Sequence, residues 1–194
     1  MGVTSDDISE RYLKRAIAEI NDLGGEIARA AGADRAPVLG SGHPLADILL
    51  LKQRPQPSEV HEGVAFFGRT GQAILKSIQR LGIDPMAVYG TNCFKFVDEP
   101  EEEAQAWLSR EIHIVQPKII VVMGEEARLF LNAIRFPLGS EIEAVPGEIQ
   151  RFTPSIEALV TPDVDASLDD QQTKRAFWAA FKALGPWWSA LPPY

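Results

Sequence analysis

Cysteine is nearly absent from the chain, which has only Cys93 among its 194 residues. A single thiol forms no disulfide within the chain, and it cannot supply the several thiolates that a cysteine-based zinc site or iron–sulfur cluster requires. The sequence therefore predicts no disulfide, no metal site of this kind and no cofactor.

Long apolar runs and an excess of basic residues are also missing. No segment reaches the roughly 18 consecutive apolar residues of a membrane-spanning helix, and the charged, amphipathic N-terminus is unlike a secretory signal. We therefore expect no membrane partner and a cytoplasmic location. The 27 Asp and Glu outnumber the 19 Lys and Arg, for a net charge of −8. This balance disfavours nucleic-acid binding by the whole surface but leaves room for a local basic patch.

Short apolar runs alternate with amphipathic stretches along the chain. The runs predict buried strands at 46–51, 87–92, 118–124 and 158–162. Helical spacing of apolar residues predicts helices at 8–31, 71–81, 100–115, 125–134 and 171–184. Gly24 and Gly25 are expected to interrupt or kink the first helix. The Pro- and Gly-rich segment 52–71 is expected to be a long irregular loop.

This alternation predicts an α/β fold, a three-layer α/β/α sandwich around about four parallel strands. We expect one domain over 1–194, with an N-terminal helical segment at 1–36, a core at 37–184 and a Pro- and aromatic-rich tail at 185–194. Ligands of such sheets bind beyond the carboxyl ends of the strands. Here those ends lead into 52–71, Asn92, Gly124-Glu125 and 161–168.

Five segments in the same order resemble the family 4 uracil-DNA glycosylases. GVAFFGRTGQAI at 63–74 is similar to the family segment GRPFVGRAGQ, and VLGSGHPLADILLL precedes it where the family has VxGEGNPxADIMFV. VYGTNCFKF resembles YITNVVKC, and EEEAQAWLSREIHIVQPKIIVVMG resembles a helix and strand of the family. KRAFWAAFKAL resembles the C-terminal helix of the family. The resemblance covers roughly residues 37–184 and implies the uracil-DNA glycosylase fold.

The resemblance implies hydrolysis of the bond between uracil and deoxyribose, with DNA containing uracil or another damaged base as partner. Such enzymes flip the base out of the stack into a pocket. Family 4 also holds an iron–sulfur cluster on four cysteines. This chain has Phe96 at one of those positions and Ala104 near another, so we expect no iron–sulfur cluster.

Two residues match the base-binding positions of the family. Phe66 falls on the Phe that stacks on uracil, and its flat ring suits that role, although it could instead fill the core. Asn92 follows Thr91 at a predicted strand end and falls on the Asn that reads the uracil edge, although it could instead satisfy a local turn. Phe67, at an apolar family position, is expected in the core.

The segment KQRPQ at 52–56 departs from the GEAPG motif of the family, and only Pro55 is retained. Gln53 stands where the family has Glu, and a Gln side chain cannot act as a general base. Arg54 could occupy the base pocket or bind phosphate. Alternatively, Lys52, Gln53 and Arg54 form a solvated loop.

A second departure follows the last predicted strand, where family 4 has a His in an HPS motif. In TPDVDAS the His position falls on Asp163 or Asp165, depending on one gap. An imidazole can stabilise negative charge on the departing uracil, whereas a carboxylate repels it. The two aspartates form either an acidic turn or a base that activates water.

Three hypotheses follow from these matches and departures. The first is a divergent DNA glycosylase with an open pocket at Phe66 and Asn92 and a nearby carboxylate, in which uracil excision is weak or lost. The second is a non-catalytic protein that binds a nucleobase or nucleic acid, with Lys52 or Arg54 filling or charging the pocket. The third is a protein-interaction module with a closed pocket and an exposed patch at Trp187 and Trp188. The sequence leaves the oligomeric state open.

Overall fold

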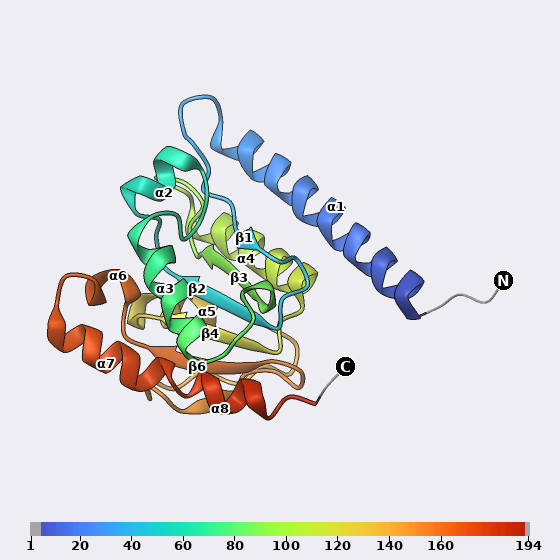
Figure 1. Ribbon diagram of the computed structural model, residues 1–194. Helices are drawn as coiled ribbons and strands as arrows, with labels where there is room; N and C mark the ends of the chain where they lie inside the picture. Colours follow the sequence, from blue (N-terminus) through green and yellow to red (C-terminus); the bar gives the residue numbers. More distant parts are fainter. Residues whose placement is uncertain (1–4, 193–194) are drawn as a thin grey trace.

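The computed structural model describes residues 5–192, which form a six-stranded sheet with helices on both faces (Figure 1). The strands lie in the order β1-β3-β2-β4-β6-β5. Their bounds are β1 Ser41–Gly42, β2 Ile48–Lys52, β3 Val88–Asn92, β4 Ile119–Met123, β5 Ile149–Arg151 and β6 Glu157–Thr161. The helices are α1 Ser5–Ala31, α2 Pro57–Glu62, α3 Arg69–Arg80, the short 3-10 helix η1 Pro85–Ala87, α4 Glu101–Val115, α5 Glu125–Ala133, α6 Val164–Ser167, α7 Gln171–Phe181 and α8 Leu184–Ser189.

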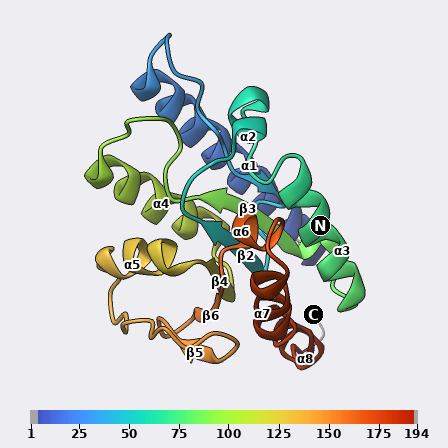
Figure 2. The same cartoon turned by 90° about the vertical axis from the view of Figure 1, so that its left-hand side faces the viewer.

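The central strands β3, β2, β4 and β6 pair in parallel, which confirms the predicted α/β architecture. The short edge strands β1 and β5 add antiparallel pairs that the apolar pattern did not predict. Figure 2 shows α4 and α5 on one face of the sheet and α3 and α7 on the other. Every residue of β2, β3 and β4 is buried because both faces are covered.

Alternate side chains of each strand enter two apolar cores. Leu49, Leu51 and Ile120 pack with α4 and α5, while Ile48 and Leu50 pack with α3 and α7. Helix α1 lies outside this sandwich and packs on α4 through a third apolar cluster. No helix within 5–192 has the length and apolarity needed to cross a membrane.

Two segments that were expected to be irregular contain helices. Helix α2 lies within the predicted loop 52–71, with Pro57 at its first position and Glu59 in its first turn. Helix α6 lies within 161–168 and is capped by Asp163. Both helices are shorter than the window over which apolar periodicity can be recognised, so only their start signals were available.

The prediction that Gly24 and Gly25 interrupt the first helix is wrong, because α1 runs unbroken from Ser5 to Ala31. A Cβ on Gly24 would lie 2.9 Å from Cδ1 of Leu39. The glycine therefore allows α1 to lie close to the neighbouring segment, and tertiary packing outweighs its poor helix propensity.

The aromatic tail packs on the body of the protein as far as it is described. Trp187 and Trp188 are partly buried against the core on the α7 side, and the indole Nε1 of Trp187 donates to Glu157 at 2.6 Å. Pro193 and Tyr194 lie outside the described residues. The exposed tryptophan patch of the third hypothesis is therefore absent from the described part of the tail.

The two glycines of α1 provide a test of this close packing. Gly25→Ala should raise the free energy of unfolding by about 0.5–1 kcal/mol, because alanine favours the helix and its Cβ would lie 3.6 Å from Arg29. Gly24→Ala should raise the free energy of unfolding by less, or lower it, because its Cβ would lie 2.9 Å from Cδ1 of Leu39. Urea denaturation of both variants measures the difference, and equal gains would show that Leu39 gives way without cost.

Candidate functional site

The carboxyl ends of three parallel strands meet at one edge of the sheet. Lys52 ends β2 and is paired in register with Asn92, which ends β3. Strand β6 ends at Thr161, and the chain turns there into α6. The sequence-predicted residues on these ends are therefore brought to the same edge, where parallel sheets bind ligands.

The Lys52 side chain lies at the centre of this edge and is only 1% exposed. Its ammonium donates to Glu59 Oε2 at 2.5 Å, to Asp165 Oδ2 at 2.8 Å and to the carbonyl of Arg54 at 3.2 Å. All three donors of the ammonium are therefore used. The same nitrogen lies 5.7 Å from the centre of the Phe66 ring.

Glu59 connects the residues of the site and is fully buried. Its Oε1 accepts from the backbone nitrogen of Phe66 at 2.5 Å and from the Asn92 side chain at 3.4 Å. Its Oε2 accepts from the backbone nitrogen of Gln56 at 2.6 Å in addition to Lys52. The carboxylate thus fixes the backbone before and after α2.

Phe66 is held in an unusual position by two glycines. Its φ is 60°, in the left-handed region that phenylalanine rarely adopts. A Cβ on Gly90 would lie 2.6 Å from its ring, and a Cβ on Gly71 would overlap its carbonyl oxygen. The ring is 9% exposed and packs with the core on the α3 side, yet it also faces the Lys52 ammonium. Phe66 therefore packs in the core and borders Lys52, and its stacking on a base stays a prediction.

Asn92 is fully buried and has one side-chain atom without a partner. Its amide nitrogen points to Glu59, whereas Oδ1 makes no hydrogen bond within the described residues. Leaving a buried acceptor unpaired is costly. The unpaired oxygen is consistent with an atom that receives a donor from a ligand.

The two aspartates after β6 have different positions. Asp163 is exposed and accepts from the backbone nitrogens of Asp165 and Ala166, so it caps α6. Asp165 points into the site, where its Oδ2 meets Lys52 and its Oδ1 accepts from the Thr70 hydroxyl at 2.5 Å. Only Asp165 of the two bonds to Lys52 within the described chain.

The remaining predicted residues lie at the rim. The guanidinium of Arg54 is exposed and lies 4.0 Å from the centre of the Phe94 ring. The Gln53 carbonyl accepts from the backbone nitrogen of Phe94 at 3.1 Å, which joins the segments after β2 and β3. Gln53 and Pro55 are partly buried. Lys52, rather than Arg54, brings positive charge next to Phe66.

Sequence reasoning missed Glu59, Gln56 and Thr70 as parts of the site. The signal for Glu59 was local, because Pro57 and Glu59 stand at the first and third positions of a helix start. Thr70 and Gln56 each bond directly to Asp165, which lies about a hundred positions further along the chain. No local pattern in the sequence indicates such contacts. Phe67, expected in the core, is instead 46% exposed.

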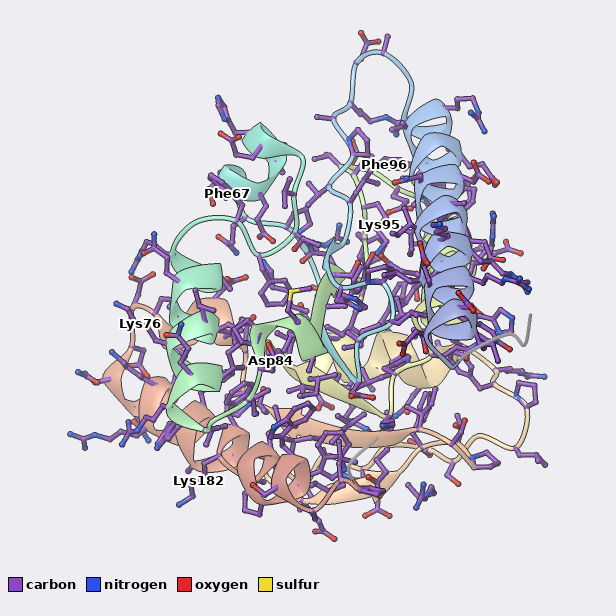
Figure 3. The ribbon with its side chains drawn as sticks, turned by 45° about the vertical axis from the view of Figure 1, so that its right-hand side comes forward. Phe67, Lys76, Asp84, Lys95, Phe96 and Lys182 are labelled. Atoms are coloured by element: carbon purple, nitrogen blue, oxygen red, sulfur yellow. The ribbon has the colours of Figure 1, made fainter. Side chains whose placement is uncertain are left out.

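A second buried polar cluster lies on the α4 face of the same edge. Lys95 donates to Glu111 Oε2 and Thr91 Oγ1 at 2.5 Å each, and Tyr89 donates to Glu111 Oε1 at 2.7 Å. Burial and the nearby Glu111 carboxylate raise the pKa of the Tyr89 phenol. Figure 3 shows Lys95 beside α1, away from α3.

The one thiol of the chain is not a reactive group in this fold. Cys93 is fully buried next to Asn92 in the chain. Burial raises the pKa of its thiol above the ordinary value of 9.0. Cys93 therefore stays protonated at neutral pH and acts as a small apolar side chain.

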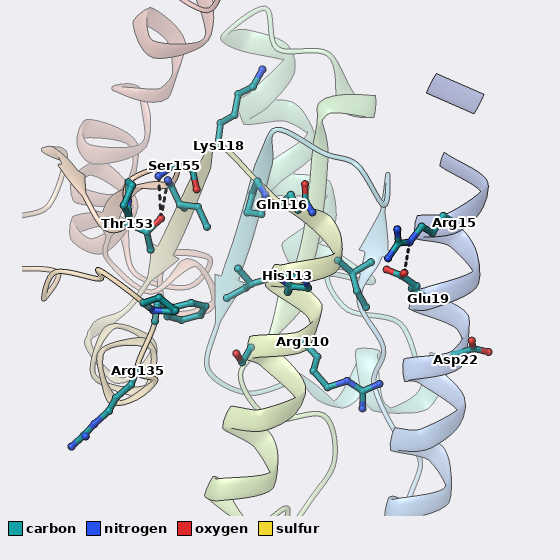
Figure 4. A pocket seen from close by; sticks show the side chains of 18 of the residues that line it. Arg15, Glu19, Asp22, Arg110, His113, Gln116, Lys118, Arg135, Thr153 and Ser155 are labelled. Carbon is teal, nitrogen blue, oxygen red and sulfur yellow. Dashed lines mark hydrogen bonds and ion pairs between the residues drawn. The ribbon is translucent and has the colours of Figure 1, made fainter. Parts of the chain in front are cut away.

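A separate cavity of about 1070 Å³ lies between α1, α4 and the segments 135–137 and 153–156 (Figure 4). None of the seven sequence-predicted site residues lines it. Several of its charged side chains are already paired, as in Arg15 with Glu19 and Arg110 with Glu26. The carboxyl edge of the sheet therefore remains the candidate site.

The sequence also matches a known protein family. The sequence model of the Uracil DNA glycosylase superfamily matches residues 39–184, which is most of the chain. The chain belongs to the uracil-DNA glycosylase superfamily. The matched range contains all the residues of the candidate site and excludes the whole N-terminal segment with α1.

Relatives of the chain within the superfamily are type-4 uracil-DNA glycosylases. The enzyme of Archaeoglobus fulgidus is 24% identical over 159 residues, which cover 76% of this chain and 80% of the relative. The enzyme of Sulfurisphaera tokodaii is 32% identical over 103 residues, covering 48% of this chain and 47% of the relative. That of Saccharolobus solfataricus is 29% identical over 103 residues, or 48% of each chain. The chain thus matches about half the length of two of these relatives.

The four-cysteine cluster of the resembled family does not fit this member of the superfamily. The chain has one cysteine, and no three His, Cys, Asp or Glu side chains gather as a metal site within 5–192. Phe96, at one cysteine position, packs with Leu23, Ile27 and Ala31 of α1. Ala104, near another, lies on α4 and is fully buried in the apolar core on that face of the sheet. Apolar contacts occupy these positions.

Glu99 provides a test of the electrostatics beside the site. Burial raises the pKa of its carboxyl above the ordinary 4.5, although the Lys95 backbone nitrogen donates to Oε2, and Oε1 has no partner among the described residues. The folded protein therefore holds the Glu99 proton more tightly than the unfolded chain does. The contribution of protonated Glu99 to the free energy of unfolding is lost as the pH rises through the raised pKa. Glu99→Gln should consequently stabilise the protein more at pH 7 than at pH 4.

Urea denaturation of the wild type and Glu99→Gln at both pH values measures this difference. The exposed Glu148→Gln removes the same charge and serves as the control. A pH-independent difference between Glu99→Gln and the wild type would contradict the raised pKa.

Proposed function

We propose that this superfamily member binds DNA, accommodates a flipped base between Phe66 and Asn92, and excises uracil slowly or not at all because Lys52 suppresses the chemistry. The observation that carries this proposal is the buried Lys52 ammonium, bonded to both Glu59 and Asp165 within 5.7 Å of the Phe66 ring. The relatedness to type-4 uracil-DNA glycosylases supports the choice of DNA as partner.

The contacts of Lys52 oppose water activation in two ways. Asp165 is the carboxylate of the site with some exposure, since its side chain is 15% accessible. A carboxylate that accepts from Lys52, Thr70 and Gln56 has few lone pairs left for a water molecule. The Lys52 stem also fills space beside Phe66, at a position where the resembled motif has glycine.

Binding of a base is supported by the groups that remain. Phe66 offers an aromatic ring held in place by Gly90 and Gly71. The unpaired Oδ1 of Asn92 is an acceptor for an imino N–H such as that of uracil. Because both residues are nearly or fully buried, entry of a base requires Lys52 or the segment 63–68 to move.

Lys52→Gln tests whether the ammonium suppresses excision. The variant keeps a donor for Glu59 but frees Asp165, so uracil release should rise by at least about tenfold, equivalent to about 1.4 kcal/mol of barrier. Labelled single- and double-stranded DNA with one uracil, followed by alkaline cleavage, measures the rate. Phe66→Ala and Asn92→Ala, made on the Lys52→Gln background, should abolish the gain.

Lys95→Gln is the matched control, since it removes another fully buried lysine that pairs with a carboxylate but not with Glu59 or Asp165. Circular dichroism establishes that each variant is folded. Rapid excision by the wild type that Lys52→Gln reduces would overturn the proposal and make Lys52 catalytic. Tighter binding of uracil-containing than of thymine-containing DNA, without cleavage by any variant, would favour the non-catalytic alternative.

A further inference from the structure

Helices α3 and α7 carry an unusual charge for so acidic a chain. Neither helix contains an Asp or Glu, whereas the chain as a whole has 27 of them. Five exposed cations lie on the two helices, and a sixth is the residue directly after α7. We call them the basic face: Arg69, Lys76, Arg80, Lys174, Arg175 and Lys182.

The cations of the basic face form two neighbouring rows. Arg69, Lys76 and Arg80 are spaced by seven and four residues, which places them along one side of α3. Lys174 and Lys182 lie one turn before and one turn after Trp178 on α7. The Arg80 guanidinium lies 4.5 Å from the centre of the Trp178 ring, so the two rows are in contact. Figure 3 shows Lys76 and Lys182 on the side of the molecule away from α1.

Most of these cations have no anionic partner in the part of the chain that the structure describes. Arg69 pairs with Asp169 at 2.7 Å, but Lys76, Lys174, Arg175 and Lys182 form no ion pair within residues 5–192. The bordering aspartates are otherwise engaged, because Asp84 caps η1 and Asp170 caps α7. Several like charges held together without counterions favour a polyanionic partner.

The size and position of the rows match a nucleic-acid strand. Arg69 to Arg80 spans about 16 Å at 1.5 Å per helical residue, which corresponds to roughly five phosphates of one strand. The α3 row begins beside the candidate site, since Thr70 donates to Asp165 there. The half-exposed ring of Phe67 lies two residues before Arg69 and could stack on an unpaired base.

We propose that the basic face binds the phosphate backbone of a single DNA strand that runs from the candidate site across α3 and α7. The proposal rests on the proposed function for the choice of DNA. It assigns the affinity for DNA to a surface that is distinct from Lys52, Phe66 and Asn92. The net charge of −8 then limits binding to this one face.

The test uses single-stranded DNA of about 20 nucleotides without uracil, so that it does not depend on excision. Fluorescence anisotropy between about 50 and 200 mM salt gives the affinity and its salt dependence. The combined variant Lys76→Ala, Lys174→Ala, Lys182→Ala should bind on the order of tenfold more weakly at low salt, and its slope of log affinity against log salt should fall by about two. Phe67→Ala should weaken binding at least about fivefold without changing that slope.

The combined variant Arg11→Ala, Lys14→Ala, Arg29→Ala removes the same charge from exposed positions of α1 and is the matched control. Its binding and salt slope should stay near those of the wild type. Equal losses of DNA affinity in both combined variants would overturn the proposed role of the basic face. An unchanged salt slope in the α3–α7 variant would do the same. Either result would hold even if the protein excises uracil or binds uracil-containing DNA more tightly. Retained salt-dependent binding in a protein that neither excises nor prefers uracil would instead overturn the proposed function alone.

Discussion

The ion pairs of Lys52 with Glu59 and Asp165 join three parts of the chain at one point. Lys52 ends β2, Glu59 lies in α2 and Asp165 lies in α6, more than a hundred residues further along. Removing one partner of such a buried pair costs about 3–5 kcal/mol, because the remaining charge is left without compensation. The position of Phe66 also depends on this network, since Glu59 accepts from its backbone nitrogen. The candidate site and the local fold are therefore stabilised by the same contacts.

A second lysine has the same role on the other face of the sheet. Lys95 binds Glu111 of α4 and the carbonyl of Asn92, so it joins the end of β3 to α4. Lys52 is the last residue of β2 and Lys95 follows β3, and the buried polar residues Thr91, Asn92 and Thr161 also stand at the carboxyl ends of their strands. Buried charges are tolerated only where opposite charges and hydrogen bonds surround them. The carboxyl ends of β2 and β3 provide such surroundings for Lys52 and Lys95.

The sequence predicted the central strands, the main helices and the edge of the sheet where the site lies, because apolar periodicity depends on local neighbours. It also singled out Phe66, Asn92 and Asp165, which the fold brings together. Glu59 was missed, because Pro57 and Glu59 indicate only the start of a helix, whereas the contact with Lys52 appears only in the folded chain. The position of Gly24 in an unbroken helix and the exposure of Phe67 depend on contacts with distant segments, which periodicity cannot report.

The N-terminal helix covers one of the positions that match a cysteine of the resembled family. Residues 39–184 carry the superfamily match, and α1 lies before them. Phe96 stands at one cysteine position and is 2% exposed beneath α1. Burial of a phenylalanine contributes about 1.5–3 kcal/mol, and Gly24 lets α1 lie close to Leu39, which packs against the same cluster. A hydrophobic contact between α1 and the segment after β3 thus occupies a position at which the resemblance implies a cysteine in family 4.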